Sequence, residues 1–173
     1  MIIAKVFVEG RSRTKGSLKP VHIRMGGGRC KVSLTEDHAL ATPWKKRMIH
    51  ALNVARASDV DRDQAYADAV EIHCFFRFER ERAVGGGAWP SHETLWPTAP
   101  DIGDEDKLRR NVLDALTQAH VIADDALSIG GANYKRWCVE GEQPGVLIVV
   151  HSADAFTLDQ VLVLEDAYAR QTW

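Results

Sequence analysis

The residues best suited to chemistry are acidic side chains within residues 103–128. Asp104 and Asp106 lie two positions apart where a loop enters a predicted helix, and Asp125 follows nineteen residues after Asp106. A helix of about fifteen residues followed by a short reversal can bring Asp125 back toward the other two. Three clustered carboxylates repel one another unless a hard divalent cation holds them. If they converge, such a set of oxygen ligands is typical of a Mg²⁺ site, and bound Mg²⁺ activates water for phosphodiester hydrolysis.

The same residues also have a purely structural explanation. Acidic side chains are common at helix N-termini, where they accept hydrogen bonds from free N–H groups and interact favourably with the helix dipole. An Asp-Asp pair is equally ordinary in a turn. From the residues alone, both explanations stay open.

Charge is divided unevenly along the chain. The 173 residues have a net charge of −2, but residues 1–58 hold twelve basic side chains and only three acidic ones. This first third therefore carries +9, which leaves −11 for the remainder. A basic segment beside an acidic one suggests a surface for a polyanion near a surface for a cation.

Composition excludes several classes of protein. With 45% hydrophobic and 27% charged residues, the chain is typical of a globular domain and not of a disordered or low-complexity one. Cys30, Cys74 and Cys138 are widely spaced and odd in number, which argues against a disulfide framework or a structural zinc site. No apolar run approaches the roughly 20 residues of a membrane span, and residues 1–10 do not resemble a signal peptide. We therefore expect a cytoplasmic protein with no membrane partner.

Periodicity predicts the strands that must position the acidic residues. Strict alternation predicts a strand over 70–78, and residues rich in Ile and Val predict strands over 2–9 and 146–151. Residues 128–140 are predicted as one further strand. Residues 21–25 and 30–34 flank three glycines and predict a hairpin, after a polar basic loop over 10–20.

Three helices are expected. Thr42 is the predicted N-cap of the first, with Pro43 at its first position, and the second spans 106–120. Thr157 and Gln160 form a capping box for a third, over about residues 156–171. Their expected buried stripes are Trp44, Met48, Ala51, Leu52 and Ala55 in the first, and Leu108, Val112, Ala115, Leu116 and Ala119 in the second. Strands and helices in mixed order predict one α+β domain, residues 1–173, with helices packed on a mixed sheet.

The acidic segment resembles the RusA family of Holliday junction resolvases, which are endodeoxyribonucleases of bacteria, phages and prophages. Residues 104–116 read DEDKLRRNVLDAL, and Asp124-Asp125 follow before a strand that bears a lysine. The family pattern is P-D-x-D-N/K-L-x-K-x-x-L-D-A-L, followed by D-D. Residues 10–17, GRSRTKGS, and Ser91-His92 match the family more weakly. The resemblance covers roughly residues 5–150.

This resemblance implies a RusA-like fold in which Asp104, Asp106 and Asp125 bind Mg²⁺, with Mn²⁺ able to substitute. The catalytic lysine of the family falls on Arg110, which cannot lose a proton at working pH and suits charge stabilisation better than acid catalysis. The opening Pro-Asp of the family pattern is displaced here, so Asp101 competes with Asp104 as the first ligand.

The resemblance further implies a homodimer that presents two active sites to a four-way junction, in a bacterial or phage-infected cell. The predicted third helix is expected either to serve dimerisation, through Leu158, Val161, Leu162, Leu164 and Tyr168, or to pack on its own sheet. Basic side chains should contact DNA phosphates, so affinity should fall steeply with salt. These are Arg11, Arg13, Lys15, Lys19, Lys45, Lys46, Arg47 and Lys107.

Two other functions stay open. A protein that keeps the fold and the basic surface but lacks catalysis would bind branched DNA without cutting it, and the arginine at position 110 favours this alternative. A nuclease for flaps or single strands would share the chemistry and differ only in how DNA docks.

Overall fold

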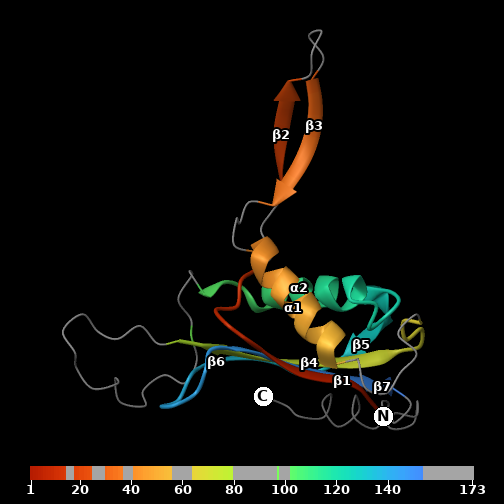
Figure 1. Ribbon diagram of the computed structural model, residues 1–173, viewed down its shortest axis with the longest axis vertical. Coiled ribbons are helices and arrows are strands. Elements are labelled where there is room, and N and C mark those ends of the chain that lie inside the picture. Colours follow the sequence, from red (N-terminus) through yellow and green to blue (C-terminus); the bar gives the residue numbers. More distant parts are fainter. Residues whose placement is uncertain are drawn as a thin grey trace, which may run out of the picture.

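A mixed five-stranded sheet carries two helices on one face in the computed structural model (Figure 1). The structure describes residues 1–14, 18–24, 30–36, 41–55, 64–79, 97 and 102–153. The sheet contains β1 (Ile2–Glu9), β4 (Val70–Phe78), β5 (Ser128–Gly130), β6 (Asn133–Trp137) and β7 (Gly145–Ser152). The helices are α1 (Ala41–Ala55) and α2 (Glu105–Gln118), and η3 (Asp125–Leu127) is a short 3₁₀ turn. A separate hairpin of β2 (Leu18–Arg24) and β3 (Cys30–Glu36) stands apart, beyond the N-terminal end of α1 (Figure 1).

Strand β4 lies in the middle of the sheet. It pairs antiparallel with β7 on one side, and parallel with both β5 and β6 on the other. The edge strand β1 pairs antiparallel with β7. Parallel and antiparallel pairs in one sheet, with helices on one face, confirm the predicted α+β class with a mixed sheet.

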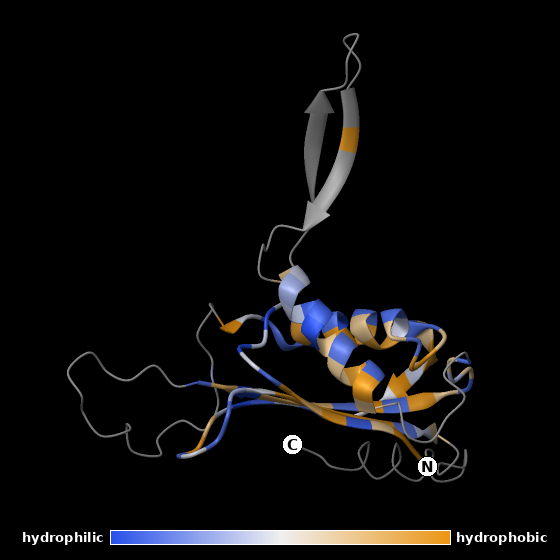
Figure 2. Cartoon of the chain, in the orientation of Figure 1, coloured by the Kyte–Doolittle hydropathy of each residue, from blue (hydrophilic) through white to orange (hydrophobic). Residues whose placement is uncertain are grey.

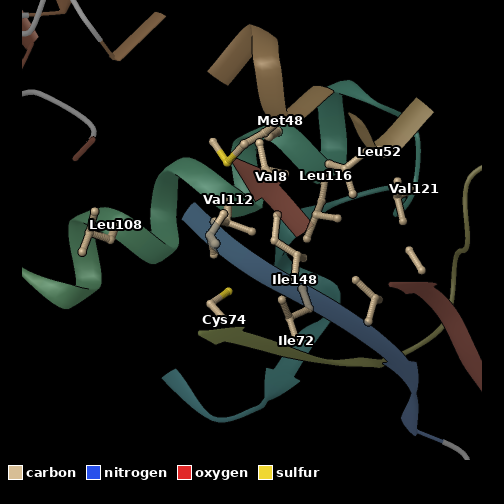
Figure 3. Close-up of a cluster of buried hydrophobic side chains, with 14 of the residues drawn as sticks. Val8, Met48, Leu52, Ile72, Cys74, Leu108, Val112, Leu116, Val121 and Ile148 are labelled. Carbon is tan, nitrogen blue, oxygen red and sulfur yellow. The ribbon is translucent and has the colours of Figure 1, made fainter. Parts of the chain in front are cut away.

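The core fills the space between the helices and the sheet. Val70, Ile72, Cys74, Phe76 and Phe78 are all buried, as their alternation predicts. Hydrophobic residues concentrate in the strands and on the part of α1 nearest to them (Figure 2). In Figure 3, labelled side chains of α1 and α2 face those of β4 and β7, and they include Met48, Leu52, Val112, Leu116, Ile72 and Ile148.

Four local predictions need correction. β2 begins at Leu18, so residues 18–20 are strand and not loop. α1 begins at Ala41 and includes Thr42, because Pro43 fits the first turn, where its missing N–H would have no helical partner. Ala55 is exposed because it ends that helix. Residues 128–140 form two short strands, since Gly131 between them has a φ of 118° that interrupts the extended backbone.

Two other predictions lie outside the described residues: the C-terminal helix over about 156–171 and most of the long loop between 79 and 103. In the part of the chain that the structure describes, neither helix has the length and hydropathy needed to cross a bilayer.

Glu142 links the turn before β7 to β6 through hydrogen bonds. Its carboxylate accepts hydrogen bonds from both terminal nitrogens of Arg136, at 2.5 and 2.6 Å, and from the Val139 N–H at 3.0 Å. Arg77 of β4 lies 3.5 Å away. The hydrogen bonds from Arg136 are the largest cause that lowers the pKa of Glu142, which falls to about 2.

This network makes the stability of the fold pH-dependent. Because the folded pKa lies below the usual 4.5, the stabilisation is complete above about pH 4.5 and is lost as pH falls toward 2. We expect Glu142→Gln to lower the free energy of unfolding by about 1–3 kcal/mol at pH 7, with the difference from wild type shrinking to near zero at about pH 2. Urea denaturation across this pH range measures it. Glu140→Gln, at an exposed position of the same turn, is the control, and an equal loss there would contradict the assignment.

Candidate functional site

The predicted acidic site is centred on the exposed N-terminal turn of α2. Asp104 occupies the N-cap position, but its side chain makes no capping hydrogen bond. Its Oδ2 instead lies 2.7 Å from Lys107 Nζ, and Asp106 Oδ2 lies 2.5 Å from Arg110 Nη2. The hydrogen bond from Lys107, and then its charge, lower the pKa of Asp104, so this carboxylate is ionised at neutral pH. Each candidate ligand on α2 therefore has a cation one helical turn away.

The Asp124-Asp125 turn divides its roles between its two carboxylates. Asp124 Oδ1 accepts a hydrogen bond from the Ala126 N–H at 2.8 Å and caps η3. Asp125 is exposed in the first position of that 3₁₀ turn. The structural explanation therefore applies directly to Asp124. It also fits Asp104, which lies at the N-cap position of α2 and pairs with Lys107, and Asp125, which lies in the first turn of η3.

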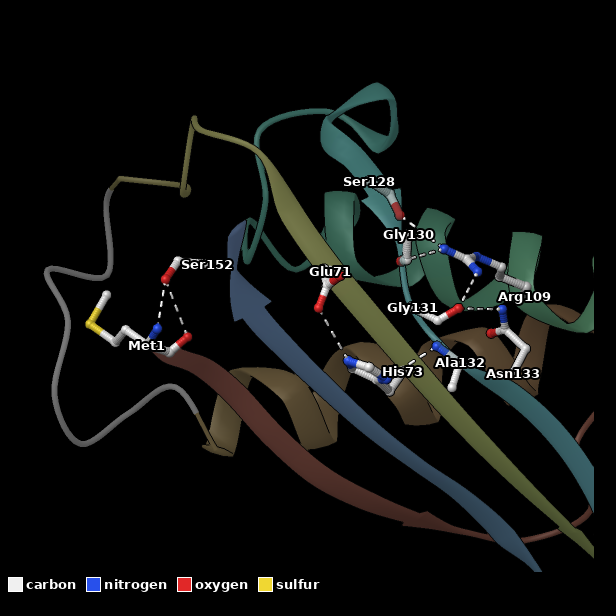
Figure 4. A network of polar contacts seen from close by, with 10 residues as sticks. All are labelled: Met1, Glu71, His73, Arg109, Ser128, Gly130, Gly131, Ala132, Asn133 and Ser152. Atoms are coloured by element: carbon white, nitrogen blue, oxygen red, sulfur yellow. Dashed lines mark hydrogen bonds and ion pairs between the residues drawn. The ribbon is translucent and has the colours of Figure 1, made fainter. Parts of the chain in front are cut away.

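Arg109 holds the returning chain against α2. Its guanidinium donates to Ser128 Oγ at 3.1 Å, to the Gly130 carbonyl at 2.9 Å and to the Gly131 carbonyl at 3.4 Å (Figure 4). Arg109 lies one turn after Asp106, and Ser128 lies one residue after η3. The segment from Ser128 to Gly131, which follows Asp125, therefore lies within reach of the Arg109 side chain.

The convergence of the three carboxylates remains a prediction. Among the residues described, no group of three or more acidic, His or Cys side chains is placed to hold a metal ion. Asp101, the competing first ligand, lies outside these residues. Aspartate oxygens are the donors that Mg²⁺ prefers, but an ion at this turn would have to displace Lys107 and Arg110 from their partners.

A third cation approaches the same turn from the sheet. Lys135 of β6 donates from Nζ to the Gly103 carbonyl at 2.9 Å, and its charge further lowers the pKa of Asp104. Lys107, Arg110 and Lys135 thus surround the candidate ligands with positive charge. Such a turn can attract a phosphate group as well as support ionised carboxylates.

The basic loop over residues 11–14 is attached to this turn. Asn111, buried in the apolar stripe of α2, donates from Nδ2 to the Arg13 carbonyl at 2.9 Å. Gly103 has a φ of 87°, and a Cβ there would overlap the methyl group of Thr14. These two contacts bring residues from the start of the chain beside Asp104.

Three of the predicted DNA-binding residues line one concave surface. Arg11, Arg13 and Arg47, together with Pro43 and Trp44, surround a space of about 210 Å³. Of the others, Lys46 is exposed and Lys45 half-buried on α1, and Lys107 lies on α2. Lys15 and the side chain of Lys19 lie outside the described part of the chain.

Sequence reasoning missed Asn111 and Arg109 as residues that assemble the site, and it noted Lys135 only as the lysine of the strand after Asp125. Asn111 left a signal, because a polar residue between Leu108 and Val112 on an apolar stripe must find a hydrogen-bond partner when buried. Compared with known proteins, the chain matches no family model and no curated protein.

Proposed function

We propose that this protein is a Mg²⁺-dependent endodeoxyribonuclease that resolves Holliday junctions and other branched DNA by phosphodiester hydrolysis, in recombination and repair. One observation carries the proposal: Asp104 and Asp106 lie exposed at the start of α2, and the basic loop over 11–14 is bonded to that same helix. A phosphate backbone held by the basic residues would pass close to the acidic turn.

Each side chain then has a defined role. Asp104, Asp106 and Asp125 would hold the ion, which when bound lowers the pKa of a water molecule and offsets charge on the phosphate. Arg110 keeps its positive charge at every working pH and would stabilise the phosphate oxygens as negative charge develops on them. It cannot donate a proton to the leaving oxygen, so a water molecule would supply that proton.

Resolution needs two cuts, and so the proposal includes a homodimer with one active site for each of the two strands. The predicted C-terminal helix is the segment proposed to form its interface.

A synthetic four-way junction tests the proposal. Incubated with the purified protein and Mg²⁺, it should yield paired nicks in opposing strands, and a linear duplex of the same sequence should remain intact. Parallel reactions with flap and single-stranded DNA test whether the protein is instead a nuclease for those substrates, which would be cut faster than the junction. Absence of junction cleavage over a range of pH, with either Mg²⁺ or Mn²⁺, would contradict the proposal.

A non-catalytic protein that binds branched DNA is the second candidate. The pairing of Asp104 with Lys107 and of Asp106 with Arg110 favours it, because both carboxylates are already neutralised by protein cations. Calorimetry separates the two candidates. A nuclease should bind Mg²⁺ or Mn²⁺ in a manner that Asp106→Asn abolishes, whereas a pure binder should bind the junction without a carboxylate-dependent metal site.

A further inference from the structure

We infer that Arg11, Arg13 and Arg47 form a pocket for a single phosphate group of the DNA backbone, in which guanidinium geometry and not charge alone provides the binding. The pocket lies where the basic loop over 11–14 meets the first turns of α1. The inference rests on the proposed function only in taking DNA as the source of the phosphate.

The size of the pocket suits a phosphate group. Its volume is about 210 Å³. It is below the roughly 300 Å³ at which sites for drug-sized ligands begin. A phosphate group fits a space of this size.

Among the described residues, three guanidinium groups and no carboxylate line this space. Arg13 is half-buried, and burial, together with the charge of Arg11, lowers the pKa of its guanidinium. Both effects favour an anionic ligand at this position. A phosphate offers oxygens that guanidinium groups bind in pairs, and such charge-assisted bonds are about twice as strong as neutral ones.

The backbone around the pocket holds its side chains in place. Arg47 Nη1 donates to the Glu9 carbonyl at 3.1 Å, which fixes the position of its guanidinium. Gly10, with a φ of 128°, provides the space: a Cβ there would lie 2.5 Å from Arg47 Nη1 and 3.2 Å from Trp44. Pro43 and Trp44 belong to the first turn of α1, whose N-terminus adds partial positive charge.

The hydrogen bond from Asn111 to the Arg13 carbonyl links this pocket to α2. The pocket and the acidic turn are therefore both attached to α2. The pocket would fix the register of the strand and read no base sequence.

The affinity of the protein for junction DNA tests the inference. It is measured in EDTA, so that no divalent ion is present and the DNA is not cut. We expect Arg13→Lys and Arg47→Lys, which keep the charge, each to weaken binding about 10-fold, because lysine lacks the fork of donors. Arg13→Gln and Arg47→Gln should each lose about 10- to 100-fold and lower the salt slope by about one. Lys5→Gln, an equal change of charge at an exposed position of β1, should lose less than about threefold.

Neutral methylphosphonates placed at one backbone position at a time identify the bound phosphate. One substitution should weaken wild-type binding but not weaken binding by Arg13→Gln any further, as expected for groups in direct contact. Lysine variants that bind like wild type, or glutamine variants that bind like Lys5→Gln, would overturn the pocket. Saturation by inorganic phosphate that junction DNA fails to displace would overturn DNA as its source.

These outcomes are independent of cleavage. If wild type binds the junction and the pocket variants fail as expected, but no nicks form with Mg²⁺, the pocket stands and the nuclease proposal fails. If nicks form and the pocket variants bind the junction as wild type does, the nuclease proposal stands and the pocket fails.

Discussion

Asp106→Asn and Asp125→Asn should each reduce junction cleavage about a thousandfold while junction affinity stays within about threefold of wild type. Asparagine has nearly the shape of aspartate but lacks its charge, and so it holds a divalent cation poorly. Loss of several kcal/mol of charge stabilisation corresponds to about this factor. Affinity should persist because the phosphates are bound by cations, and removing a carboxylate beside them lowers repulsion. Single-turnover cleavage and binding in EDTA, measured on the same preparations, provide the two readouts.

Asp124→Asn is the matched control for Asp125→Asn. Asp124 caps η3 through its Oδ1, and asparagine caps as well as aspartate does. This variant should therefore cut at close to the wild-type rate, although it removes a carboxylate from the adjacent position. Full turnover by Asp106→Asn and Asp125→Asn together would show that the acidic site is wrongly assigned, and full activity of only one would remove that residue from the site.

Gly131→Ala should have the largest effect on folding, a loss of about 4 kcal/mol or more in the free energy of unfolding. A Cβ at this position would overlap the Ile72 carbonyl in β4 and lie 2.8 Å from the Ile72 nitrogen. Both are backbone atoms in the central strand, so neither can move without disturbing its pairing with β7 and β6. The φ of 118° adds strain to any residue with a side chain.

Gly141→Ala separates the steric overlap with β4 from the strain of a side chain at positive φ. Gly141 also has a positive φ, of 80°, but a Cβ there would meet no atom within 4 Å. We expect it to cost only about 1–2 kcal/mol, the cost of the left-handed conformation. Denaturant unfolding followed by circular dichroism compares the two variants. Equal losses would show that the close approach to β4 contributes nothing.

Periodicity was enough to predict the elements that carry the most burial. β4 alternates without a break, and α2 has an apolar stripe in which Leu108, Val112 and Leu116 are all buried. In both elements, the positions that the periodicity marks as apolar are the positions that the fold buries. The break between β5 and β6 was not predictable in this way, because it depends on how closely Gly131 approaches a strand almost 60 residues earlier in the chain.

The acidic members of the candidate site are a prediction from the sequence, and the contacts around them were mostly not predictable from it. The spacing of Asp104 and Asp106 is visible in the sequence, and so is the return of the chain to Asp125. The attachment of the basic loop is not, since Asn111 and Arg13 are separated by 98 positions and meet only through the packing of α2. The i,i+4 spacing predicts that Arg110 lies beside Asp106, as the structure confirms, but local sequence does not show that Arg109 turns toward β5.

The pairing of β1 with β7 has a consequence for synthesis on the ribosome. The register joins Glu9 to Gly145, so the first strand has no neighbour in the sheet until nearly the whole described chain has been made. At about 5–20 residues per second, that interval is on the order of 7–27 s. During it, the edge of β1 that pairs with β7 in the folded protein has no strand to pair with, although α1 is made soon after β1 and can already pack against it. Slower translation between β1 and β7 therefore lengthens the time for which this edge can pair with other chains.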